Sequence, residues 1–94
     1  MIREQEVMIR LLDALLPGVK IYLFGSRARG TNRPTSDIDL ALDMGRELSL
    51  QEKSRAWRVL EALHLVHKID VVDVWSIPQE LKDVILKEGI VWKS

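Results

Sequence analysis

The sequence predicts a single α/β domain in which helices pack against a sheet of four strands. Three observations support this fold class: helix-like and strand-like segments alternate along the chain, the chain has 94 residues, and 47% of them are hydrophobic. A chain of this length forms one core, so residues 1–94 are expected to be one domain. The absence of cysteine excludes disulfides, thiolate metal sites and cysteine nucleophiles.

The first half of the chain is expected to contain two helices and two strands. Residues 2–16 carry apolar side chains three and four positions apart, which predicts a helix that ends at Pro17-Gly18. β-Branched and aromatic side chains predict a strand over 19–24. A glycine-rich basic turn (GSRARG) then leads into a short helix, and the alternating segment IDLAL at 38–42 predicts the second strand.

The second half continues this alternation. Ser49 and Glu52 form a capping box, in which the serine caps the start of a helix and the glutamate reaches back to it. Residues 67–75 are expected to form a third strand. A further capped helix should begin within 76–79 and end at Gly89, and the apolar segment IVW that follows should be a short edge strand.

Some apolar residues exceed what one small core requires. Ile9 and Leu16 widen the apolar stripe of the first helix, and either the domain's own sheet or another chain would cover them. Trp57, Trp75 and Trp92 are expected in the core or at an interface with a partner.

The charge balance excludes other classes of protein. Fourteen Lys and Arg residues balance fourteen Asp and Glu residues, so strong nucleic-acid binding by this chain alone is not expected. No apolar run approaches the ~20 residues that span a bilayer, and the N-terminal segment lacks the apolar core of a signal peptide. We therefore expect a cytoplasmic protein with no membrane partner. His64 and His67 flank a loop and are expected to be solvated there or to cap a helix rather than to be catalytic.

A candidate phosphate-binding turn lies between the first strand and the short helix. Gly25 allows close approach to the backbone, and Ser26 is expected to cap the helix and to offer its hydroxyl. Arg27 and Arg29 add positive charge in a form that suits phosphate. These residues equally suit a basic surface turn, and the turn alone does not decide between the two. It is not a Walker P-loop, because the second glycine and the lysine of that motif are missing.

Three acidic residues favour a phosphate-binding turn over a basic surface turn. Asp37 and Asp39 share one face of the second strand, where their repulsion favours a divalent cation such as magnesium. Asp70 lies in an apolar strand, so it is expected to be a buried third acid that needs a cation. Asp73 points to the opposite face and is expected to be solvated or ion-paired, and Asp43 to be exposed. The three site carboxylates should converge within about 3–6 Å, and at least one should have a raised pKa.

The combination of GSRARG, SDIDLAL and KIDVVD resembles the nucleotidyltransferase superfamily that includes DNA polymerase β. The resemblance spans about residues 19–74 and implies a polymerase β-like core with a mixed sheet of about four strands. The short length is similar to that of the minimal nucleotidyltransferases (MNT). Members of that group commonly act with a helical HEPN-domain protein as antitoxin and toxin.

The resemblance implies a magnesium-dependent transfer of a nucleoside monophosphate, with AMP from ATP as the expected case. Two magnesium ions would take part, and Asp70 would also help to activate the acceptor hydroxyl. The implied site residues are Asp37, Asp39 and Asp70 for catalysis and metal binding, and Gly25, Ser26, Arg27 and Arg29 for the nucleotide.

Three functions remain open from the sequence. The first is transfer of AMP to a hydroxyl of a partner protein, expected to be a HEPN toxin for which this chain is the antitoxin, in a homo- or hetero-oligomer. The second is an antitoxin that neutralises its partner by contact without catalysis. The third is transfer to a small molecule. The intact acids favour the first, and the lack of a second domain argues against the third.

Overall fold

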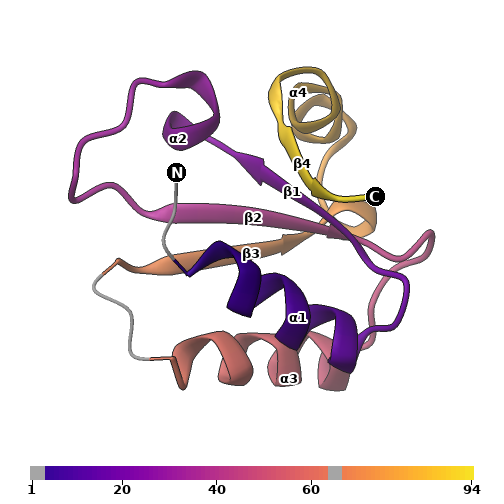
Figure 1. The fold of residues 1–94 in the computed structure, drawn as a ribbon. Helices are drawn as coiled ribbons and strands as arrows, with labels where there is room; N and C mark the ends of the chain where they lie inside the picture. The colour runs from indigo at the N-terminus through magenta and orange to yellow at the C-terminus, as the bar shows by residue number, and fades with distance from the viewer. Residues whose placement is uncertain (1–3, 64–66) are drawn as a thin grey trace.

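A computed structural model describes residues 4–63 and 67–94 of the chain, so His64 lies outside the described residues. Helices and strands alternate along the chain, as the sequence predicted (Figure 1). The elements are α1 (Gln5–Leu15), β1 (Lys20–Phe24), α2 (Ser26–Arg29), β2 (Ile38–Asp43), α3 (Leu50–Glu61), β3 (Ile69–Asp73), the 3-10 turn η1 (Val74–Ser76), α4 (Gln79–Glu88) and β4 (Ile90–Lys93).

The strands form one mixed sheet in the order β3-β2-β1-β4. Strand β1 pairs antiparallel with both β2 and β4, whereas β2 and β3 are parallel. A parallel pair needs a crossover connection, which α3 supplies. Because β2 and β3 run the same way and β1 runs against them, the starts of β2 and β3 and the end of β1 lie at one edge of the sheet.

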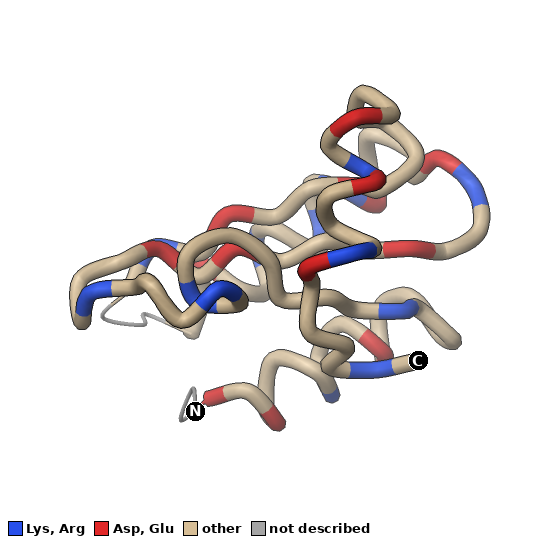
Figure 2. Tube along the Cα trace, turned by 90° about the horizontal axis from the view of Figure 1, so that it is seen from above, with Lys and Arg blue, Asp and Glu red and all other residues tan. Residues whose placement is uncertain are grey.

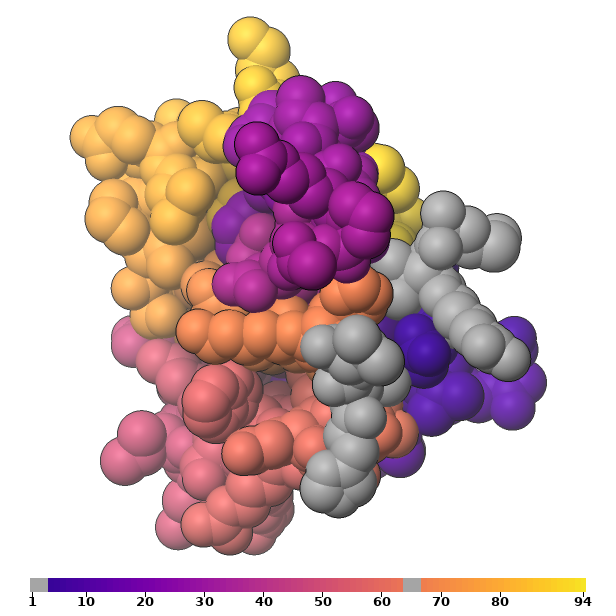
Figure 3. Space-filling model, turned by 90° about the vertical axis from the view of Figure 1, so that its left-hand side faces the viewer, coloured from indigo at the N-terminus to yellow at the C-terminus, as the bar shows by residue number. Residues whose placement is uncertain are grey.

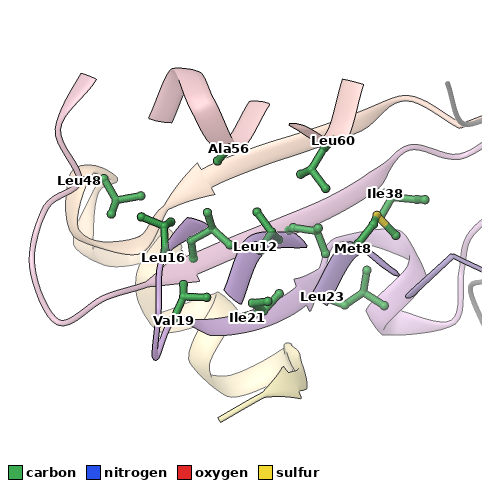
Figure 4. Packing of buried hydrophobic residues seen from close by; sticks show 12 residues of the cluster. Met8, Leu12, Leu16, Val19, Ile21, Leu23, Ile38, Leu48, Ala56 and Leu60 are labelled. Atoms are coloured by element: carbon green, nitrogen blue, oxygen red, sulfur yellow. The ribbon is translucent and has the colours of Figure 1, made fainter. Parts of the chain in front are cut away.

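One face of the sheet packs against α1 and α3 (Figures 1 and 4). Alternate strand residues point to this face, as the period of a strand requires. The side chains of this core are Met8, Leu12, Leu16, Val19, Ile21, Leu23, Ile38, Leu40, Leu42, Leu48, Ala56 and Leu60. Each is nearly or completely buried, which makes this apolar cluster the main stabilising feature of the fold.

The opposite face of the sheet is only partly covered. Helix α4 packs there through Ile85, which forms a small buried cluster with Ala41 and Val74 (Figure 1). Helix α2 lies near the same face at the other end of the strands. Residues 39 and 70 belong to this face, at the end of the sheet that lies near the short helix α2 and away from α4.

The third strand is shorter than the predicted 67–75. It ends at Asp73, and the next three residues turn away as η1. The turn follows from Asp73 itself, whose carboxylate accepts a hydrogen bond of 3.0 Å from the backbone N–H of Trp75. A strand pattern cannot reveal this change, because Val74 and Trp75 are as compatible with a strand as the residues before them.

The helix starts confirm one expected cap and correct two. The capping box of Ser49 and Glu52 is present at the start of α3. Helix α4 starts at Gln79 without a side-chain cap, and the hydroxyl of Ser76 instead donates to the Asp73 carbonyl at 3.1 Å. At α2 the N-cap is Gly25 rather than Ser26, so the serine is the first residue of the helix.

The surplus apolar residues are largely covered by the domain itself. Leu16 is buried, and Ile9 and Trp92 pack against the main core. Trp57 and Trp75 remain about half exposed, at 48% and 46%. Within the described residues, no helix has both the length and the apolar character needed to cross a membrane.

Candidate active site

The register of the sheet brings two of the predicted acids face to face. Asp39 is the direct partner of Asp70 in the parallel β2–β3 pair. Asp37 lies two residues before Asp39 and just outside the strand, where its side chain is exposed. Figure 3 views this end of the molecule, with the segment that joins α2 to β2 (magenta) next to β3 (orange). The predicted acids therefore occupy neighbouring segments at one edge of the sheet.

The predicted glycine turn meets the acids at the same edge. Phe24, the last residue of β1, pairs with Asp39, so Gly25 follows directly beside that carboxylate. Gly25 has φ = +75°, a conformation that residues with a side chain rarely adopt. A Cβ atom at this position would also collide with the Asp39 carboxylate. Glycine is therefore required here by both the turn and the acid beside it.

The electrostatic environment raises the pKa of the Asp39 carboxyl above its ordinary value. Partial burial is the largest cause, and the negative charges of Asp70 and Asp37 add to it. The positive charges of Arg27 and Arg29 act in the opposite direction. This confirms the expectation of one raised pKa, although burial contributes more than the repulsion on which that expectation rested.

The three carboxylates have no partner of opposite charge among the described residues. The ion pairs found among the described residues involve other acids, namely Glu6, Asp13, Glu47 and Glu52. The side-chain hydrogen bonds to aspartates in the same part of the chain end on Asp13, Asp43, Asp73 and Asp83. Within residues 4–63 and 67–94, the side chains of Asp37, Asp39 and Asp70 thus have neither an ion pair nor a side-chain hydrogen bond.

These oxygen donors fit a hard divalent cation, because such an ion would relieve the repulsion that raises the pKa of Asp39. The predicted convergence of the three carboxylates within about 3–6 Å stays a prediction. Across residues 4–63 and 67–94, no three acidic or histidine side chains are grouped so that they could hold one metal ion as they stand. The strand register places the backbone of Asp39 directly beside that of Asp70.

The two arginines of the turn differ in their surroundings. Arg29 is exposed at the end of α2, whereas Arg27 is half-buried. The guanidinium of Arg27 donates to the carbonyls of Ser36 and Asp37, at 2.9 and 3.3 Å from Nη2 and Nε. Figure 2 shows basic and acidic positions side by side at this end of the sheet. Sequence reasoning missed these inward contacts because the pattern GSRARG carries no information on which arginine turns inward.

Expectations about the surroundings of three aspartates were wrong. Asp70 is exposed rather than buried, since β3 is an edge strand with no layer above this residue. Asp73, expected to be solvated or ion-paired, is only 5% exposed and accepts from the backbone N–H groups of Leu48 and Trp75. Asp43, expected to be exposed, is half-buried. It accepts from the Gly45 N–H and the Trp75 indole at 2.8 and 2.7 Å.

A hollow of about 410 Å³ lies at the other end of the strands, away from the acids. It is lined mainly by apolar groups of α3, β3 and η1, including Trp57, Val72 and Ile77. Asp73 is the acid among its lining residues and already accepts two backbone hydrogen bonds, so the hollow has no pair of carboxylates like that of Asp39 and Asp70. The edge that holds Asp39 and Asp70 is therefore the better candidate for chemistry.

Comparison with known proteins identifies relatives along almost the whole chain. The family model described as "Polymerase beta, Nucleotidyltransferase" matches residues 16–94. A protein of Methanocaldococcus jannaschii that bears the name of a protein adenylyltransferase is 38% identical over 87 residues, covering 90% of this chain and 92% of the relative. A protein of Haemophilus influenzae named as the protein adenylyltransferase MntA is 26% identical over 92 residues, covering 96% and 81%.

Solved structures show the same similarity in three dimensions. A chain of a toxin–antitoxin crystal structure with AMP-PNP superimposes with a TM-score of 0.77 and 30% identity, covering 94% of this chain and 71% of that one. A chain of the complex between the tri-AMPylated Shewanella oneidensis HEPN toxin and the MNT antitoxin gives a TM-score of 0.72 and 26% identity, covering 95% and 68%.

Proposed function

The chain belongs to the polymerase β nucleotidyltransferase family, and on that premise we propose that it transfers AMP from ATP to a hydroxyl of a partner protein. The proposed partner is a helical HEPN toxin, for which this chain acts as the antitoxin. Support comes from the relatives named as protein adenylyltransferases and from the similar chains in toxin–antitoxin complexes.

The observation that carries the proposal is the cross-strand pair of Asp39 and Asp70 beside Gly25. A protein that acted by contact alone has no physical need for like-charged carboxylates without partners, because their repulsion opposes folding. Such an arrangement is retained where the charges serve a ligand. The function is therefore assigned to this edge of the sheet.

In the proposal, Asp37, Asp39 and Asp70 hold two magnesium ions. These ions, when bound, neutralise charge on the triphosphate and on the oxygens that attack and leave. Asp37 and Asp39 come from one segment and Asp70 from its parallel neighbour, so the carboxylates that would hold the ions are supplied by two adjacent strands. Small side-chain rotations are required, since the three groups do not yet form a metal-binding set.

The triphosphate is proposed to lie on the turn that contains Gly25 and Ser26. Among the described hydrogen bonds, the amides of Ala28 and Arg29 donate to the Gly25 carbonyl, at 3.2 and 3.1 Å. The amide and hydroxyl of Ser26 are then available for phosphate oxygens. Arg29 is exposed beside them and supplies a positive charge that suits the phosphates.

The proposed reaction is an in-line displacement at the α-phosphorus. The acceptor oxygen forms a bond to phosphorus as the bond to the bridging oxygen of the β-phosphate breaks, and pyrophosphate leaves. The hydroxyl proton passes to Asp70, which is exposed and able to meet an incoming acceptor. The described residues place only the short helix α2 near this edge, so a protein surface can approach and exclude water from the reaction.

The test combines the purified protein, the product of the gene next to its own, magnesium and ATP labelled at the α-phosphate. We expect label on the partner, its loss with Asp37→Asn, and its retention with Asp43→Asn. Asp43→Asn is the matched control, since Asp43 is near the far end of β2 and already has two hydrogen-bond partners. A partner that stays unlabelled, yet is inhibited equally by wild type and Asp37→Asn, would instead establish neutralisation by contact.

A further inference from the structure

We propose that Arg27 is a positioning residue that holds the backbone of Asp37, rather than a residue that contacts the nucleotide. The proposal rests on the proposed function, because the position of Asp37 matters only if that carboxylate binds a ligand. It concerns a residue whose expected role was phosphate binding together with Arg29.

The guanidinium of Arg27 contacts the segments that lead into two strands. Its Nη2 donates to the Ser36 carbonyl at 2.9 Å, and its Nε donates to the Asp37 carbonyl at 3.3 Å. Nη2 also lies 3.4 Å from Nδ1 of His67, two residues before β3. Arg27 itself belongs to α2. One side chain thus links the three parts of the chain that carry the predicted site residues.

Asp37 needs such a contact because it lies outside the strand. The β2 ladder begins at Ile38, whose N–H donates to the Lys68 carbonyl at 2.9 Å. The preceding turn is held by Ser36, which exchanges hydrogen bonds with Arg33. Between these two anchors, the carbonyl of Asp37 is held by the Nε of Arg27. A guanidinium presents donors on separate nitrogens in a fixed planar fork that spans two neighbouring carbonyls, whereas the donors of an ammonium group share one nitrogen and rotate freely.

The direction of the Arg27 side chain also argues against a nucleotide contact. The Arg27 side chain lines a hollow together with Gln5, Leu23 and Trp92. Leu23 and Trp92 pack against the α1 core, whereas the acids belong to the opposite face of the sheet. With Nε and Nη2 directed at protein atoms, most of the rigid fork is already engaged. Arg29, by contrast, is exposed.

The two roles predict different kinetics. A phosphate contact contributes to ATP affinity, so its loss raises KM for ATP. A residue that holds a metal-binding carboxylate acts on metal affinity and kcat, typically by about 10- to 100-fold. We therefore expect Arg27→Gln to raise the magnesium concentration for half-maximal transfer by about tenfold and to lower kcat. KM for ATP at saturating magnesium should stay within about twofold of wild type.

Three further variants separate geometry from charge. Arg27→Lys keeps the charge but not the fork, so it should recover less than about a third of the lost activity if position is what matters. Arg29→Gln should have the opposite effects: KM for ATP should rise, and the magnesium dependence of transfer should be unchanged. Arg55→Gln is the matched control on the exposed surface of α3 and should behave as wild type.

A binding measurement decides the inference even where no transfer occurs. Mn²⁺ binding, measured by calorimetry with AMP-PNP present, should be about tenfold weaker in Arg27→Gln than in wild type and unchanged in Arg55→Gln. If Arg27→Gln binds Mn²⁺ about tenfold more weakly than wild type but wild type labels no acceptor, the proposed transfer fails and the role of Arg27 stands. The inference is overturned if Arg27→Gln binds Mn²⁺ like wild type, if it raises only KM for ATP, or if wild type binds no Mn²⁺.

Discussion

The two ends of the β2–β3 pair use the same residue type in opposite ways. At the start of the strands, Asp39 faces Asp70, and neither carboxylate has a hydrogen-bond or ion-pair partner among those of the described residues. At the other end, Asp43 and Asp73 each accept two hydrogen bonds. An aspartate whose oxygens are satisfied by the fold stabilises it, whereas one left unsatisfied beside a like charge is available for a ligand.

The comparison also explains why burial alone is a poor guide to function here. Asp73 is the most deeply buried of these acids and has a structural role, joining the start of α3 to η1 through Leu48 and Trp75. Asp70 is exposed and belongs to the candidate site. The presence or absence of hydrogen-bond partners therefore separates the two ends more clearly than the exposed fraction does.

The largest expected effect is on catalysis at the unsatisfied end. Asp39→Asn should lower AMP transfer by about a thousandfold or more, equivalent to about 4 kcal/mol of transition-state stabilisation. Its melting temperature should stay the same or rise slightly, because a partly buried repulsive charge is removed. Transfer assays and thermal melts of Asp39→Asn and Asp43→Asn measure both effects. A marked loss of stability in Asp39→Asn would instead give Asp39 a structural role.

The next largest effect is on stability at the satisfied end. Asp73→Ala leaves two backbone N–H groups without their acceptor, so it should lower the free energy of unfolding by about 2–4 kcal/mol. For a domain of this size, the melting temperature should fall by about 10 °C or more. The exposed Asp83→Ala should change the free energy of unfolding by less than about 0.5 kcal/mol. Similar melts for the two variants would refute the structural role of Asp73.

A smaller effect is expected from glycine replacements. Gly25→Ala places a side chain at φ = +75° and against Asp39, so it should cost about 1–3 kcal/mol of stability and also reduce transfer. Gly18 has φ = +84° but open space around the added atom, so Gly18→Ala carries the backbone strain without the collision. The difference in free energy of unfolding between the two variants, measured with denaturant, gives the cost of the collision with Asp39 apart from that of the backbone strain. Equal losses of stability and of transfer would mean that Asp39 does not constrain the turn.

The smallest effect concerns proton binding. The pKa of Asp39 is raised, so the folded state holds that proton at a higher pH than the unfolded state, and this residue's contribution to stability falls as pH rises through the window above 3.8. Glu52 is the opposite case. The hydrogen bonds from Arg46 and Ser49 lower its pKa to about 2, so its contribution is full above 4.5 and is lost as pH falls toward 2.

Carboxyl NMR titration of the metal-free protein measures both groups directly. Asp39 should titrate above its ordinary value and Glu52 near 2. In Arg46→Gln the Glu52 titration should move up toward 4.5, while that of Asp39 stays unchanged. An Asp39 carboxyl that titrates at or below 3.8 would contradict the picture of uncompensated charge at this end of the sheet.

Much of the fold could be predicted from the sequence because its signals are local. The helical spacing of α1, the capping box of Ser49 and the breaks at Pro17 and Gly89 identified the alternating elements. Polarity alternation placed Asp39 on the face away from the core. These features depend on neighbouring residues, and the structure confirms them.

The features that were missed depend on contacts between distant parts of the chain. The burial of Asp73 requires Leu48, which lies 25 positions away, to present its N–H. The exposure of Asp70 follows from the edge position of β3, which parity alone does not give. The inward direction of Arg27 depends on the carbonyls of Ser36 and Asp37. Spacing predicts which residues share a face, but not which partners satisfy them.

The central claim, that the unsatisfied acids form the ligand-binding end of the sheet, is tested most directly by calorimetry of magnesium with AMP-PNP. Wild type and Asp43→Asn should bind the nucleotide with a clear dependence on magnesium. Asp39→Asn should lose that dependence while keeping its fold. Equal magnesium-dependent binding by wild type and Asp39→Asn, or its loss only in Asp43→Asn, would contradict the account.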